Sequence, residues 1–138
     1  MNKPHARVRI DFSESCSLGP GKIALLEGIE RTGSLSAAAR ALGMSYRRGW
    51  LLLHSVNNAF AEPAVALTAG GKDGGGARLT EFGRRLIATY RDLESAVDAL
   101  TAKAFASLHA KRTVSSADTA PRRSVSRSLI GAHSKRRK

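Results

Sequence analysis

Side chains able to bond to phosphates or bases cluster between positions 45 and 50 of the sequence. The cluster consists of Ser45, Tyr46, Arg47, Arg48 and Trp50. An arginine presents two parallel donors that match the edge of a guanine, and serine and tyrosine hydroxyls bond to phosphates or bases. Two arginines on the surface of an ordinary helical hairpin would give the same local sequence, so the elements around the cluster must decide between the two interpretations.

Two short helices joined by a tight turn are predicted around this cluster. The first covers residues 35–42 and follows Ser34, a residue type that caps helix N-termini. The second follows Ser45 and runs to about Phe60. In a helix-turn-helix the first turns of the second helix face base edges in the major groove, so the helix at 45–60 is predicted to enter that groove. Serine hydroxyls at the start of the first helix, those of Ser34 and Ser36, are predicted to add DNA contacts.

Small and apolar side chains predict how these two helices pack. Ala39 and Gly43 lie four residues apart and are predicted to let the helices cross closely. The other residues expected in the shared core of the turn are Leu35, Ala38, Leu42 and Met44. The second helix is predicted to bury a stripe of residues three or four positions apart, namely Gly49, Leu53, Val56 and Phe60.

A glycine-rich hairpin is predicted directly after the helix-turn-helix. Two short segments, residues 65–68 and 77–80, flank a loop with five glycines, which predicts a β-hairpin over 65–79. A helix-turn-helix followed by a hairpin is the order of a winged helix. As the wing, this hairpin would bring Lys72 and Arg78 to the DNA backbone; the alternative is a turn without a binding role.

The flanking segments predict a strand and two further helices. Residues 8–12 alternate apolar and charged types, as in a half-buried strand. A helix is predicted from Pro20 to Gly33, and a long one from Glu81 to about Leu108. The apolar positions of the long helix recur every three or four residues. Its C-terminal half would expose an apolar stripe unless a second copy covers it, so a homodimer is predicted, with the contact residues Tyr90, Leu93, Val97 and Leu100.

Charge is distributed unevenly along the 138 residues, whose formal net charge is +12. Residues 1–108 contain 14 Lys/Arg and 10 Asp/Glu, whereas 109–138 contain nine and one. The composition of 109–138 predicts a disordered basic tail that attracts polyanions. A single cysteine and the lack of a long apolar run favour a cytoplasmic protein with no internal disulfide and no membrane partner.

Enzyme chemistry is not expected from this sequence. The four histidines are scattered, without the spacing of metal ligands. No nucleophile or acid/base constellation is recognisable, so neither a catalytic site nor a metal or cofactor is predicted.

Four segments together are distinctive of a known family. They are Gly19–Leu26, Thr32–Ala39, Gly43–Trp50 and the glycine-rich stretch Gly70–Thr80. Over about residues 5 to 100, the chain resembles the N-terminal winged helix-turn-helix domain of ModE, the molybdate-dependent transcriptional regulator, which is similar to the DNA-binding domain of LysR-type regulators. The resemblance implies a dimer held by the strand and long helix, with a recognition helix that opens at Ser45 and a wing that carries Lys72 and Arg78.

The sequence thus predicts a mainly α fold with a small β-hairpin wing, divided into residues 1–108 and a basic tail at 109–138. The expected function is sequence-specific binding of double-stranded DNA by a homodimeric transcriptional regulator. Full-length ModE carries C-terminal molybdate-binding domains, and only a 30-residue tail occupies that place here. Two alternatives stay open: a molybdate-binding sensor, which is not favoured for this chain alone, and nonspecific nucleic-acid binding through the tail.

Overall fold

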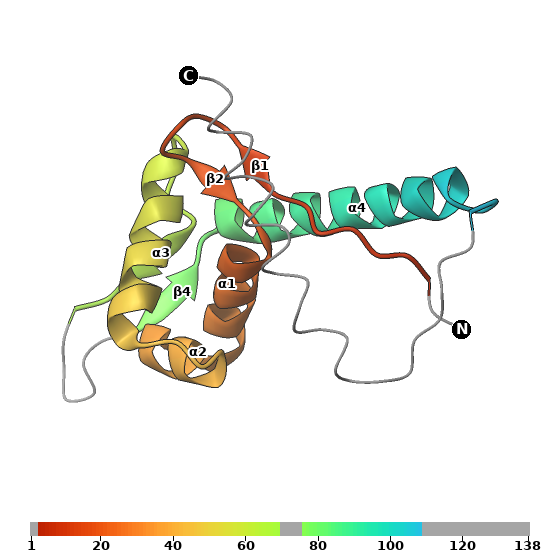
Figure 1. Cartoon of the computed structure of the whole chain (residues 1–138). Coiled ribbons are helices and arrows are strands. Elements are labelled where there is room, and N and C mark those ends of the chain that lie inside the picture. Colours follow the sequence, from red (N-terminus) through yellow and green to blue (C-terminus); the bar gives the residue numbers. More distant parts are fainter. Residues whose placement is uncertain (1–2, 70–75, 109–138) are drawn as a thin grey trace, which may run out of the picture. The chain divides into compact units, whose positions relative to one another are not determined.

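The computed structural model describes residues 3–69 and 76–108, in which four helices are accompanied by two short hairpins (Figure 1). In chain order the elements are β1 (Ile10–Asp11), β2 (Ser17–Leu18), α1 (Pro20–Thr32), α2 (Leu35–Ala41), α3 (Tyr46–Ala59), β3 (Val65–Leu67), β4 (Ala77–Leu79) and α4 (Glu81–Ala104). This order confirms the predicted mainly α fold, with a helix-turn-helix followed by a β-hairpin. The predicted tail, residues 109–138, lies outside the described residues.

The two predicted serine caps are confirmed at the starts of α2 and α3. The Ser34 hydroxyl accepts a hydrogen bond from the Ala37 amide at 3.0 Å, and that of Ser45 accepts one from the Arg48 amide at 3.1 Å. Each cap satisfies an amide that the helix itself leaves without a partner. Gly43, between the two helices, has φ +71°, a left-handed conformation that glycine adopts at no steric cost.

Close packing of α2 involves Ala39, as predicted, but its partner is not Gly43. A Cβ atom on Gly28 would lie 3.0 Å from the Cβ of Ala38, and one on Gly49 would lie 3.0 Å from the Cβ of Ala39. These contacts join α2 to α1 and to α3. The prediction that Gly43 shares the close crossing with Ala39 was wrong, because Gly43 forms the turn and has open space around it.

Leu42 also departs from the prediction, since it is 39% exposed and does not enter the shared core. It follows the last residue of α2, where the chain turns away from the core. The other predicted core residues of the turn behave as expected: Leu35 and Ala38 are buried, and Met44 packs against the core cluster.

The hairpin of β3 and β4 is antiparallel and is fixed to the helices at both ends. Its register pairs Val65 with Leu79 and Ala66 with Arg78. The Asn57 side chain, in the last turn of α3, accepts hydrogen bonds from the amides of Ala64 and Val65 at 2.8 and 3.0 Å and donates one to the Val65 carbonyl at 3.0 Å.

The β4 strand is also bonded to the beginning of the helix-turn-helix. The Ala77 amide donates a 3.0 Å hydrogen bond to the carbonyl oxygen of Gly33, which ends α1. Thr80 caps α4 by accepting from the Gly83 amide, and its hydroxyl lies 2.7 Å from the Pro63 carbonyl oxygen. The wing is therefore attached to α1, to α3 and to the start of α4.

The N-terminal segment forms a second hairpin, which the sequence predicted only in part. The predicted strand at 8–12 is reduced to β1, and β1 pairs with β2, for which no strand was predicted. Residues before β1 lie along α4 (Figure 1). There the Ala6 amide donates to a carboxylate oxygen of Asp98 at 3.0 Å, and the Tyr90 hydroxyl donates to the Val8 carbonyl at 2.6 Å.

The α4 helix changes from buried to exposed along its length. Leu86 and Tyr90 face the core, with 8% and 1% exposure. Beyond them, Leu93 is 39% and Leu100 is 65% exposed, and Val97 between them is half-buried. Tyr90, predicted as a dimer contact, therefore belongs to the core of its own chain. The helix ends at Ala104, a turn earlier than predicted.

Candidate nucleic-acid interface

The α3 helix presents one face to the core and the opposite face to solvent. Gly49, Leu53 and Val56 are buried. With about 100° of rotation per residue, the direction opposite to these three residues passes through Arg47 and Leu51. Both are exposed. Arg47 therefore stands at the centre of the outward face, while Arg48 lies at its side.

The exposed face of α3 is positively charged and has no acidic counterpart. Between Tyr46 and Ala59 the helix contains two arginines and no Asp or Glu. The helix dipole adds partial positive charge at its N-terminus. Since the Ser45 hydroxyl accepts a bond from the Arg48 amide, its proton is directed elsewhere and is available to an acceptor outside the chain.

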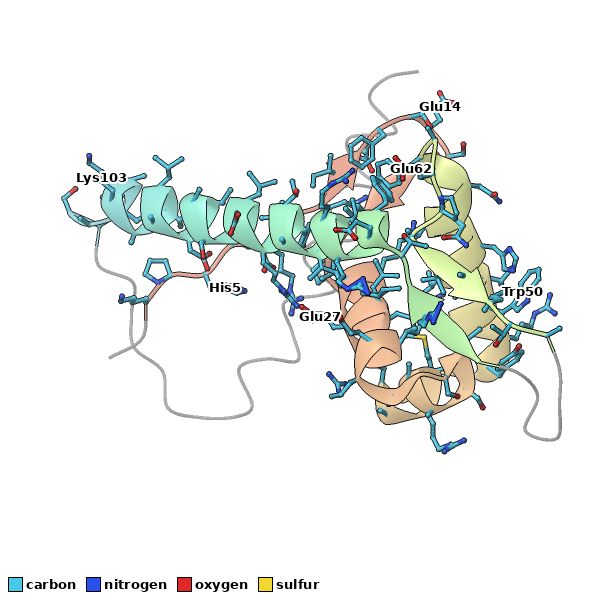
Figure 2. All side chains as sticks on the ribbon, turned by 180° about the vertical axis from the view of Figure 1, so that it is seen from behind. His5, Glu14, Glu27, Trp50, Glu62 and Lys103 are labelled. Carbon is cyan, nitrogen blue, oxygen red and sulfur yellow. The ribbon has the colours of Figure 1, made fainter. Side chains whose placement is uncertain are left out.

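Two aromatic side chains flank the arginines on α3. Tyr46 is 56% and Trp50 is 41% exposed. Trp50 packs on the ring of His54, with 3.8 Å between ring centroids. Figure 2 shows Trp50 at the outer side of α3. The histidine thus supports the indole, and its Nε2 atom is buried and makes no hydrogen bond within the described residues.

Other predicted contact residues lie on α2 and on the wing. Ser36, in the first turn of α2, is exposed, while Ser34 is half-buried and occupied as a cap. Arg78 is exposed on β4, directly across from Ala66. Lys72 lies outside the described residues.

Two features of this region were not predicted from the sequence. Leu51 is 49% exposed, and no role was predicted for it. Lys22 of α1 donates to the Ser17 carbonyl at 2.7 Å and to the Ser55 hydroxyl of α3 at 2.9 Å. Partial burial, with a smaller effect from Arg9, lowers the pKa of Lys22. This lysine therefore ties α3 to α1 and β2, and only the folded chain brings its partners together.

The described residues contain neither a membrane-spanning helix nor a candidate metal site. Over residues 3–69 and 76–108, no helix is long and apolar enough to cross a bilayer. Those residues also form no cluster of three His, Cys, Asp or Glu side chains suited to a metal ion.

Sequence comparison shows that the chain is similar to bacterial regulators. It is 43% identical over 100 residues to the molybdenum transport protein ModE of Azotobacter vinelandii, covering 70% of this chain and 37% of that protein. The DNA-binding transcriptional dual regulator ModE of Escherichia coli is 41% identical over 71 residues, covering 51% of this chain and 27% of that protein. This chain is homologous to part of ModE. The resemblance predicted from its motifs is thereby confirmed.

Further relatives carry other names. The molybdenum-pterin-binding protein MopB of Rhodobacter capsulatus is 49% identical over 80 residues, covering 58% of this chain and 30% of that protein. The chain thus spans about a third of the length of the curated relatives it matches. No protein-family model matches it. A crystal structure of a LysR family transcriptional regulator aligns with 65% of this chain and 30% of that chain, at a TM-score of 0.47 and 19% identity.

Proposed function

We propose that this ModE homologue is a transcriptional regulator that binds specific sites on double-stranded DNA. One observation carries the proposal: the face of α3 that points away from the core is exposed and basic, with Arg47 at its centre. The homologues that match the chain include proteins named as transcriptional regulators. In this proposal α3 enters the major groove and the β3–β4 hairpin contacts the adjacent backbone.

The proposed contacts divide between bases and phosphates. Arg47 and Arg48 have the donor geometry for guanine, and Tyr46 and Trp50 border them. The hydroxyls of Ser36 and Ser45 and the cationic groups of Lys72 and Arg78 suit the sugar-phosphate backbone. Ser34 acts mainly by holding the first turn of α2 in place, because its hydroxyl already caps that helix.

A homodimer is the proposed DNA-binding form. Leu93, Val97 and Leu100 recur at intervals of four and three residues on α4, and two of them are well exposed. A second copy of α4 packed along this stripe would remove it from water. Two symmetric α3 helices would then meet two half-sites of the duplex.

We propose neither a small-molecule effector nor a catalytic activity for this chain. Names of several relatives refer to molybdenum, but the chain matches about a third of their length.

Binding through the basic tail alone is the competing explanation for any DNA affinity. It predicts equal affinity for all sequences, which separates it from binding through α3.

Selection of duplexes from a random library by the full chain, followed by gel shifts, tests the proposal. Arg47→Ala and Arg48→Ala are expected to weaken binding to the selected site by about 1–3 kcal/mol each where the arginine contacts a base. Arg84→Ala, on α4, is the control, because it removes the same charge away from α3. If no sequence is selected, or if both α3 variants bind as tightly as the control, the proposal is wrong.

A further inference from the structure

Leu51 lies at the centre of the outward face of α3, next to Arg47. It is 49% exposed, whereas Leu52 is half-buried and Leu53 is fully buried. The two outward residues are four positions apart, so their side chains lie on one strip of the helix, about 6 Å apart along its axis. A groove that receives the Arg47 guanidinium would therefore have the Leu51 side chain beside it.

A second large apolar side chain of α3, that of Trp50, is exposed close to Leu51 in the sequence. Trp50, the preceding residue, is 41% exposed, and its indole packs on the ring of His54. On a basic helix face, an exposed apolar area beside the arginines is not explained by solubility or by attraction to phosphates. Such a face would fit a binding partner that offers both charged or polar groups and an apolar group.

The edges of base pairs in the major groove offer one apolar group. Guanine, cytosine and adenine present hydrogen-bonding atoms there, and thymine adds its C5 methyl group. A leucine pressed against donors and acceptors would remove water from them without replacing their hydrogen bonds. Against a thymine methyl it would bury apolar surface on both sides.

We infer that Leu51 is a specificity-determining residue that reads the C5 methyl group of a thymine. This inference rests on the proposed function and adds the base type recognised beside Arg47. Since the two residues are about 6 Å apart along α3 and base pairs are stacked about 3.4 Å apart, the thymine should lie within about two base pairs of the base contacted by Arg47.

Replacement of single thymines by uracil in the selected duplex provides the test, because it removes only the methyl group. For the full chain, one such replacement close to the Arg47-dependent base pair should weaken binding about 3- to 10-fold, the effect of one buried methyl contact. The Leu51→Ala variant should bind the thymine and uracil duplexes equally. Leu42→Ala is the control, because Leu42 is also an exposed leucine but follows α2 and has no proposed contact with DNA; it should keep the full difference between the duplexes.

The outcomes separate this inference from the proposed function. Specific binding with no effect of any thymine replacement would overturn the role of Leu51 and leave the proposed function standing. The same conclusion holds if Leu51→Ala and the unmodified chain respond equally to uracil. Failure to select any duplex would overturn both proposals. Circular dichroism of Leu51→Ala should match that of the unmodified chain, since the side chain lies on the surface.

Discussion

At Gly83, the backbone of another segment leaves no room for a side chain. Gly83 lies in the first turn of α4, where a Cβ atom would overlap the carbonyl oxygen of Ala64, just before β3. That carbonyl also accepts the Thr80 amide, so it cannot move away freely. Gly21 provides a contrast, because a Cβ atom there would meet nothing within 4 Å.

Gly83→Ala is therefore expected to destabilise the fold by about 1–3 kcal/mol, the usual range for a forced overlap in a packed region. Gly21→Ala should be neutral, or stabilising by up to about 1 kcal/mol, since alanine favours helix more than glycine does. Urea unfolding followed by circular dichroism measures both. Equal urea midpoints of unfolding for the two variants would show that the backbone at Ala64 moves away from the added methyl group at little cost.

Residues with local partners were predictable from the sequence, whereas residues with distant partners were not. The caps Ser34 and Ser45 bond to amides three residues away, so their spacing alone identifies them. Lys22 and Asn57 bond across elements, and Gly83 matters only because Ala64 approaches it. The outward direction of Arg47 was predictable from helical periodicity, and the same periodicity places Leu51 beside it, although no role was predicted for Leu51.

At the level of elements, the attachment of the wing to α3 depends on one amide side chain. Asn57 bonds to both the amide and the carbonyl of Val65 and to the Ala64 amide. Ala64 and Val65 are buried, so these backbone groups would lose their partners without gaining full access to water. Asn58, the next residue, is exposed.

Asn57→Ala should lower the free energy of unfolding by about 2 kcal/mol or more, because buried backbone groups are left unpaired. Asn58→Ala should change it by less than about 0.5 kcal/mol, as is usual for exposed positions. Hydrogen exchange at the Val65 amide should accelerate in the first variant only. An unchanged exchange rate there would mean that water or another side chain replaces Asn57.

Short strands limited what could be predicted about the elements. The β1–β2 hairpin pairs only two residues on each strand, and its second strand lacks an alternating pattern. The α3 helix, with four residues spaced along one face, was placed within a residue of its observed ends. Length and periodicity therefore decided which elements the sequence could reveal.

On the scale of the whole molecule, an ion pair links the first and last helices. Arg91 of α4 donates to both carboxylate oxygens of Glu27 on α1, at 2.9 and 2.7 Å. These hydrogen bonds lower the pKa of Glu27, although partial burial opposes the shift. A carboxyl whose pKa is lowered by folding stabilises the folded state above its ordinary titration range, and this contribution is lost as the pH falls.

Glu27→Gln should therefore be less stable than the unmodified chain at neutral pH, by about 0.5–1 kcal/mol for a pair that is partly exposed. The difference should shrink as the pH falls through the range in which carboxylates bind protons. Thermal unfolding at pH 7 and pH 3 measures it. A difference that stays constant with pH would assign the effect to packing and not to charge.

The proposed dimer makes a second prediction at this scale. Sedimentation of the full chain should give the mass of two copies, and Leu100→Asp should shift it toward one, because the charge would be buried against an apolar partner. Leu51→Asp is the control, since it places the same charge on an exposed leucine of α3. A single-copy mass for the unmodified chain would contradict the dimer.

The hydrogen bond between Ala77 and the Gly33 carbonyl has a consequence for the cost of association. Together with Asn57, it fixes the base of the hairpin to the two helices before any duplex arrives. If α3 and the hairpin contact DNA as proposed, the folded chain already fixes the distance between them, so little conformational freedom would be lost on binding. A duplex whose groove width did not match that distance would have to deform, and DNA flexibility would then be a second source of selectivity.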